Sequence, residues 1–278
     1  MIQSLHQDIS DLDTGMEDKT EKVNILRLTA ESTSEIEDTV VREFPLTIVL
    51  NDQELVTLLC SPADQKNLAV GFLYSEGLIN GRDEVKNVTF NEGTGVVRVE
   101  TEGGDVLARE ALFSRLITSG CGRGASFYSA TDVTGKKVES PLQVSVSAIL
   151  ALMKDFQHRS ETFRATGGVH SAALCDTKNI LVFNEDIGRH NAMDKVFGEC
   201  LLKDIPTDDC LVITSGRISS EILLKVARRN VPILVSKSAP TNLGVKMAED
   251  LGITLVGFVR GKRVNVYTHK QRINRGGI

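Results

Sequence analysis

Cys121 lies in a segment that could carry nucleophilic chemistry. Residues 119–124 read Ser-Gly-Cys-Gly-Arg-Gly, and three glycines within five residues predict a loop. A thiol among glycines has little cover from neighbouring side chains, and Arg123 favours the thiolate, which is the nucleophilic form. The other interpretation is an exposed turn that contains a cysteine by chance. Because an exposed free thiol is a chemical liability, the sequence favours a functional loop.

A possible phosphate site lies between an expected strand and an expected helix. It consists of Thr214, Ser215, Gly216 and Arg217. Backbone N–H groups at a helix N-terminus, beside a glycine that permits close approach, can hold a phosphate. A capped strand-to-helix turn without a ligand has the same appearance, so both interpretations stay open.

Three cations occur together in a predicted tight turn near the C-terminus. The segment consists of Phe258, Val259, Arg260, Gly261, Lys262 and Arg263. Such a turn can hold an anion, although a solvated turn would have the same composition.

Two further segments combine glycine, histidine and a basic residue where a strand should pass into the next element. They are residues 164–170, which end in His170, and residues 185–191, which contain Arg189. So many polar residues are unusual for purely structural turns, and we expect these segments to line a pocket.

Hydrophobic periodicity and turn residues predict the elements that position these segments. In the first half, strands 44–50 and 54–60 flank Asn51-Asp52, a helix opens at Ser61-Pro62 and closes near Gly77, and strands 85–90 and 96–101 form another hairpin. In the second half, the predicted strands are 171–174, 180–183, 210–214, 231–236, 253–259 and 264–268. The predicted helices there are 147–156, 191–202, 218–229 and 241–251, the last with Thr241 as N-cap.

The alternation predicts an α/β protein, α+β overall, with two domains. Residues 1–22 are expected to form a mobile acidic tail, and residues 40–128 a smaller β-rich domain that ends in the Cys121 loop. A linker over 129–144 leads to a layered α/β domain over 145–278. If Arg189, Arg217 and the 260–263 turn converge at one edge of its sheet, they form one anion pocket.

Composition narrows the function classes. The chain has 278 residues and a net charge of −5, which argues against a protein that coats nucleic acid. No apolar run approaches the roughly 20 residues of a membrane span, and no secretory signal is visible. An odd number of cysteines without repeated spacing indicates reduced thiols and a cytoplasmic location. Of the five, Cys60, Cys175, Cys200 and Cys210 are interpreted as small buried hydrophobic residues.

Several segments together resemble the FdhD-type family of formate dehydrogenase accessory sulfurtransferases. The resemblance covers most of residues 40–270 and includes EDIGRHNAMDK at 185–195, RATGGVHSAA at 164–173, TSGRISSEILLK at 214–225, SKSAPT at 236–241 and FVRGKRVNVYT at 258–268. EFPLTIVLN at 43–51 and LAVGFLYSEGLI at 68–79 extend it into the first half.

The resemblance implies a function, partners and a fold. Members of the family take sulfur from a cysteine desulfurase and pass it to the molybdenum bis-guanine-dinucleotide cofactor, which then enters formate dehydrogenase. The implied C-terminal domain has a cytidine-deaminase-like fold, and the implied assembly is a homodimer. Cys121 is expected to carry the persulfide, while the Thr214 and Arg260 turns, with Arg189 and His170, are expected to hold the cofactor.

The chain departs from the family pattern at one position. The family loop is typically CGxCG, whereas here Gly124 replaces the second cysteine. One thiol can still hold a persulfide, but a second thiol in the loop cannot expel sulfide from it. A chaperone that binds the cofactor without transferring sulfur therefore remains an alternative.

A zinc deaminase is a third possibility, suggested only by the implied fold. Zinc deaminases need a histidine followed two residues later by glutamate, and a C-x-x-C segment. His170 is followed by Ser171-Ala172, and the chain contains no C-x-x-C. We therefore expect no zinc.

Overall fold

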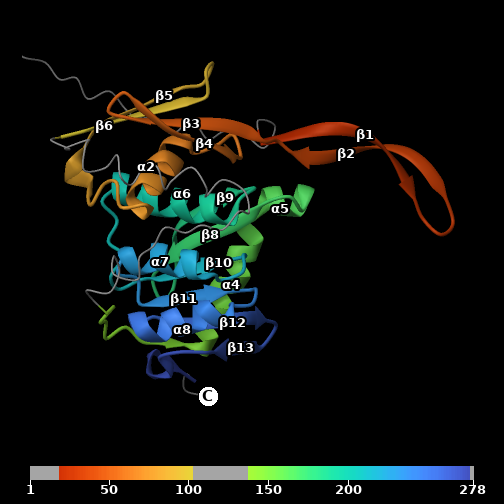
Figure 1. Ribbon diagram of the computed structural model, residues 1–278. Helices are drawn as coiled ribbons and strands as arrows, with labels where there is room; N and C mark the ends of the chain where they lie inside the picture. Colours follow the sequence, from red (N-terminus) through yellow and green to blue (C-terminus); the bar gives the residue numbers. More distant parts are fainter. Residues whose placement is uncertain (1–18, 103–136, 276–278) are drawn as a thin grey trace, which may run out of the picture.

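The computed structural model describes residues 19–102 and 137–275, which fold into a mixed α/β protein. Figure 1 shows a stack of layers, with a small sheet at one end, a larger sheet in the other half, and a hairpin that projects sideways. Within these two described ranges, no helix is long and apolar enough to cross a membrane.

The projecting hairpin consists of β1 (Thr20–Leu28) and β2 (Thr33–Val41), paired antiparallel along their full length. The sequence did not indicate it, and β1 begins inside the range expected to be a tail. In these two strands, charged residues alternate irregularly with apolar ones, so the pattern does not predict a buried face. Leu26 and Leu28 are accordingly exposed.

A four-stranded sheet forms the N-terminal core. Its strand order is β4-β3-β6-β5, made of β3 (Phe44–Leu50), β4 (Gln53–Cys60), β5 (Val85–Asn91) and β6 (Val96–Thr101). Asn51 and Asp52 both have positive φ in the β3–β4 turn, a conformation that these residue types tolerate. The buried side of α2 (Gln65–Ser75) packs on this sheet, and η1 (Arg82–Glu84) leads into β5.

A six-stranded sheet forms the C-terminal core, in the order β13-β12-β11-β10-β8-β9. The three central strands, β10 (Leu211–Thr214), β11 (Ile233–Ser236) and β12 (Thr254–Arg260), are parallel. The flanking strands β8 (His170–Cys175), β9 (Ile180–Asp186) and β13 (Arg263–Val266) pair antiparallel with their neighbours. The central strands are mostly apolar and almost entirely buried because helices cover both of their faces.

One face of this sheet packs against α6 (Arg189–Leu202), α7 (Ser220–Arg228) and α8 (Asn242–Leu251). The other face packs against α4 (Val146–Arg159), which is followed by the short α5 (Glu161–Thr166). Helices α2 and α6 cross at Gly71 and Gly198, where a Cβ on either residue would overlap the backbone of the other helix. This contact joins the two halves of the molecule.

The two ends of the described C-terminal region are tied together. Strand β14 (Ile273–Asn274) pairs with β7 (Val144–Ser145), and η3 (Lys270–Arg272) precedes it. The Arg272 guanidinium donates to the backbone oxygens of Val138, Ser140 and Gly252 at 2.7–3.2 Å.

The predicted helix start at Ser61 was wrong. Ser61 was expected as the N-cap and Pro62 as the first helical residue, but α2 begins three residues later at Gln65, with Asp64 as its N-cap residue. Ser61 makes long-range contacts instead: its N–H donates to Asp186 Oδ2 at 3.0 Å, and its hydroxyl accepts from the N–H of Ile187 at 3.1 Å. These bonds hold Ser61 outside the helix. The Thr241 cap is confirmed, since its hydroxyl accepts from the N–H of Gly244 at 3.0 Å.

Candidate functional site

The segments singled out by the sequence in the second half lie at one edge of the six-stranded sheet. The parallel strands β10, β11 and β12 end there at Thr214, Ser236 and Arg260. Because β8 is antiparallel to β10, it begins at this edge with His170, and β9 ends there beside the start of α6. Ligands of open α/β sheets bind at this carboxyl edge.

His170 and Ser215 connect the first two of these segments. His170 Nδ1 lies 3.2 Å from Ser215 Oγ, and the N–H of Ser171 donates to the same oxygen at 3.0 Å. Burial of the imidazole, together with the nearby charge of Arg189, lowers the pKa of His170 below 6.5. His170 is therefore neutral at pH 7 and can accept or donate a hydrogen bond at this edge.

Gly216 provides the close approach between the Thr214 turn and Arg189. A Cβ at position 216 would lie 2.9 Å from the Cβ of Arg189, so a larger residue would push the arginine away. The turn itself is fixed from both sides. The N–H of Gly216 donates to Thr214 Oγ1 at 3.2 Å, and Ser236 Oγ donates to the Gly216 carbonyl at 2.7 Å.

Two polar atoms beside this turn are buried without a hydrogen-bond partner among the described residues. They are Arg189 Nε and Ser219 Oγ, at the N-terminal ends of α6 and α7. A buried donor without a partner is costly and calls for an explanation. A phosphate at the helix ends would accept hydrogen bonds from both atoms.

Arg260, the last residue of β12, lies at the same edge of the sheet. Its Nε donates to the Lys237 carbonyl at 3.4 Å, and its guanidinium lies 5.6 Å from the centre of the Phe258 ring. The N–H of Lys237 in turn donates to the Thr214 carbonyl at 3.3 Å. The Arg260 turn, the loop after β11 and the Thr214 turn therefore form one continuous surface.

A cavity of about 430 Å³ adjoins this surface on the α4 side of the sheet. Its lining is apolar at Leu150, Met153 and Val259 and polar at Lys154, Gln157 and Arg260, and Gly261 also contributes to it. Val259 is buried in the core beneath it, whereas Lys262 and Arg263 are exposed beyond the turn. Arg217 is likewise exposed.

Cys121 lies outside the residues that the structure describes, as do its loop and residues 129–136 of the predicted linker. The other four cysteines are buried and free, as expected for small hydrophobic residues. Among residues 19–102 and 137–275, no three His, Cys, Asp or Glu side chains are grouped to hold a metal ion.

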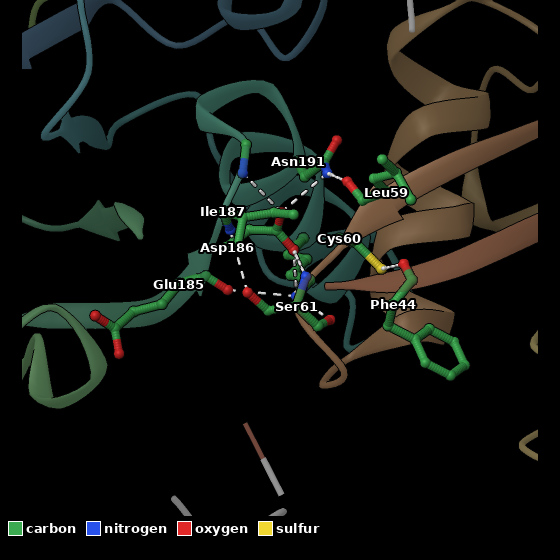
Figure 2. A network of polar contacts seen from close by, with 10 residues as sticks. Phe44, Leu59, Cys60, Ser61, Glu185, Asp186, Ile187 and Asn191 are labelled. Atoms are coloured by element: carbon green, nitrogen blue, oxygen red, sulfur yellow. Dashed lines mark hydrogen bonds and ion pairs between the residues drawn. The ribbon is translucent and has the colours of Figure 1, made fainter. Parts of the chain in front are cut away.

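Sequence reasoning missed a network of polar residues around the buried Asp186 carboxylate (Figure 2). The carboxylate of Asp186 forms a 2.7 Å ion pair with Lys195, and both side chains are completely buried. Ser61 and Asn191 contact the same carboxylate. The sequence predicted that residues 185–191 line a pocket. No local pattern connected them with Ser61, which lies 125 residues from Asp186 along the chain.

Taken together, the fold and this edge define an α/β protein with arginines, glycine and helix N-termini gathered where a phosphorylated ligand can be held. A profile of the FdhD/NarQ family matches residues 41–274, and the chain belongs to this family.

Two relatives cover nearly the whole chain. The "Sulfur carrier protein FdhD" of Bacillus subtilis is 49% identical over 260 residues, covering 93% of this chain and 99% of the relative. The protein of the same name from Listeria innocua is 44% identical, covering 92% of this chain and 99% of the relative.

A solved structure is similar in fold. The crystal structure of a protein described as a formate dehydrogenase accessory protein, from Desulfotalea psychrophila, aligns with a TM-score of 0.78 and 26% identity. It covers 92% of this chain and 100% of that protein.

Proposed function

We propose that this protein is a sulfur carrier that passes sulfur from a cysteine desulfurase to the molybdenum bis-guanine-dinucleotide cofactor needed by formate dehydrogenase. Membership of the FdhD/NarQ family, and relatives named sulfur carrier proteins along almost the full length of the chain, support this role. The similar solved structure of a formate dehydrogenase accessory protein supports the choice of client.

The cofactor is proposed to bind at the carboxyl edge of the six-stranded sheet. A guanine dinucleotide brings pyrophosphate charge, which a protein of net charge −5 must meet locally. Arg189 packs against Gly216 at this edge, and Arg260 donates to the Lys237 carbonyl farther along it. Arg189 Nε and Ser219 Oγ have no hydrogen-bond partner among the described residues. Bidentate arginine contacts and helix N-termini suit such a ligand.

The chemical part of the proposal rests on Cys121. Its thiolate attacks the outer sulfur of the desulfurase persulfide, so that a new S–S bond forms on Cys121 and the desulfurase cysteine leaves as a thiolate. Release of that sulfur as sulfide requires a second thiol, which forms a disulfide with Cys121. Since residue 124 is glycine, the second thiol must come from outside this loop.

Other parts of the proposal follow from the family. The C-terminal layered domain adopts a cytidine-deaminase-like fold, the protein works as a cytoplasmic homodimer, and no zinc takes part. The six-stranded sheet with helices on both faces is compatible with that domain fold.

Mass spectrometry of Cys121 tests sulfur transfer directly. After incubation with a cysteine desulfurase and cysteine, the peptide containing Cys121 should gain one sulfur atom, and Cys121→Ala should abolish maturation of the client dehydrogenase. Cys200→Ala is the control, because this buried thiol should not be needed for transfer. Full client activity with Cys121→Ala would favour a chaperone that binds the cofactor without transferring sulfur.

A further inference from the structure

The turn between β9 and α6 is held in place from the N-terminal half of the molecule (Figure 2). Asp186, the last residue of β9, is completely buried and accepts four hydrogen bonds or ion-pair contacts. The donors are Ser61 N at 3.0 Å, Gly188 N at 2.9 Å, Asn191 Nδ2 at 2.9 Å and Lys195 Nζ at 2.7 Å. Gly188 lies within the turn, Asn191 and Lys195 lie in α6, and Ser61 lies in the loop after β4.

Lys195 completes the network around the Asp186 carboxylate. Its ammonium group is fully buried and contacts the carbonyl oxygens of Ser61 at 3.4 Å and Glu185 at 3.3 Å, besides the Asp186 carboxylate. An uncompensated charge at this depth would be strongly unfavourable, so each member of the pair requires the other. The pair therefore fixes Ser61 and the end of β9 relative to each other.

Two more contacts extend this connection over the whole turn. The N–H of Ile187 donates to Ser61 Oγ at 3.1 Å, and Asn191 Nδ2 also donates to the carbonyl of Leu59 at 2.9 Å. Residues 186–191 are consequently held at both of their ends, by Leu59 at the end of β4 and by Ser61 in the loop that follows.

Arg189, the first residue of α6, lies within the held segment 186–191. Its Cβ faces Gly216 closely enough that a Cβ there would approach to 2.9 Å, and its Nε is buried. A rigid backbone here restricts the position of the Arg189 guanidinium in the free protein, so Arg189 loses less conformational entropy when a ligand binds. Neither Asp186 nor Lys195 needs to touch the ligand for this effect.

We propose that Asp186 and Lys195 are positioning residues, whose buried ion pair fixes Arg189 against the Thr214–Arg217 turn and so sets the affinity for a guanine nucleotide. This inference rests on the proposed function, because it assumes that the carboxyl edge binds such a nucleotide. It adds that the N-terminal half contributes to that affinity through Ser61, without lining the site.

A second buried pair on α6 offers a matched control. Asp194 and Lys225 are also buried and lie 2.8 Å apart, and Ser75 Oγ donates to the same carboxylate at 2.6 Å. The Asp194 carboxylate accepts its hydrogen bonds from Lys225 of α7 and Ser75 of α2, whereas the donors to Asp186 hold residues 186–191. Asp194→Asn therefore removes a comparable buried charge without releasing the turn.

The test is calorimetry with GDP on the full chain, carrying Asp186→Asn, Arg189→Ala, both changes together, or Asp194→Asn. Asp186→Asn should weaken GDP binding about tenfold, whereas Asp194→Asn should leave it within about twofold of the unaltered protein. Because Asp186 acts through Arg189, adding Asp186→Asn to Arg189→Ala should cause little further loss. A purely structural role would not produce this non-additivity.

Three outcomes would overturn the inference. They are unchanged affinity in Asp186→Asn, equal losses in Asp186→Asn and Asp194→Asn, or losses in Asp186→Asn and Arg189→Ala that simply multiply. If Asp186→Asn fails to fold, Asp186→Asn with Lys195→Met leaves no unpaired buried charge and takes its place, with the same expectations. Absence of GDP binding by the unaltered protein would instead contradict the proposed nucleotide site itself.

Discussion

At the scale of single residues, burial sets the chemistry of Cys60, Cys175, Cys200 and Cys210. Burial raises the pKa of Cys60 and Cys200 to about 12 and that of Cys210 to about 11, and it also raises the pKa of Cys175. A raised pKa keeps a thiol protonated until the pH approaches that value. Since the thiolate is the nucleophile, these four sulfurs are poor candidates for persulfide chemistry at neutral pH.

We therefore expect selective alkylation of the native protein. With iodoacetamide at pH 8, Cys121 should react, while the four buried cysteines stay unmodified because they are both inaccessible and protonated. Peptide mass spectrometry reads out each site, and the denatured protein, in which all five cysteines should react, is the control. Rapid native modification of Cys60 or Cys200 would contradict the assignment.

The arginines at the carboxyl edge should each contribute to nucleotide affinity. Replacing Arg217 or Arg260 by alanine should weaken GDP binding by roughly 1.5–3 kcal/mol, the range for a hydrogen bond to a charged group. Affinity should also fall as salt rises. Lys178→Ala is the control for calorimetry, because this exposed cation lies in the β8–β9 turn at the opposite edge of the sheet. Unchanged affinity in both arginine variants would place the nucleotide elsewhere.

At the scale of elements, the crossing of α2 and α6 depends on two glycines that bring the backbones together. A Cβ at Gly71 would overlap the Asp194 carbonyl, and one at Gly198 would overlap the Asn67 carbonyl. Neither glycine has positive φ, so close approach is what requires them here. The contact connects the core of the four-stranded sheet with that of the six-stranded sheet.

Gly71→Ala and Gly198→Ala should each lower the free energy of unfolding by about 1–3 kcal/mol, because the added methyl group forces the helices apart. Urea denaturation measures the loss. Gly93→Ala provides the control, since a Cβ there would meet only Asn91 Oδ1 at an ordinary 3.5 Å, and its effect should stay below about 0.5 kcal/mol. Wild-type stability in both helix variants would show that the crossing can relax without cost.

At the scale of the whole molecule, the β1–β2 hairpin stands apart from the layered body (Figure 1). An isolated two-stranded sheet is at best marginally stable in water. Most of its side chains are exposed or half-buried, and it reaches the body mainly where β2 touches α5. The family match begins at residue 41, at the end of this hairpin.

Deleting residues 1–40 should therefore leave the body folded. We expect the melting temperature to change by less than about 4 °C, which corresponds to about 1 kcal/mol for a body of this size, and GDP affinity to remain unchanged. Thermal unfolding and calorimetry check the two expectations. A much larger drop in melting temperature would show that the hairpin supports the core.

The sequence by itself determined most elements of the second half and the residues of its turns. Local periodicity carries this information, because an apolar stripe or a capping residue such as Thr241 acts within a few residues. The same local view placed Ser61 at a helix start, where a serine before proline is favourable. It also gave no sign of the β1–β2 hairpin, whose strands lack a clean alternation of apolar and polar residues.

Only the tertiary structure decided which of these residues meet. The order β12-β11-β10-β8-β9 sets Arg260, the Thr214 turn, His170 and Arg189 along one edge, and that order depends on packing across the whole sheet. The pairing of Asp186 with Lys195 and Ser61 likewise joins residues that are distant in sequence. A buried ion pair is favourable only once both charges have been removed from water together, so its partners are set by the folded core and not by local pattern.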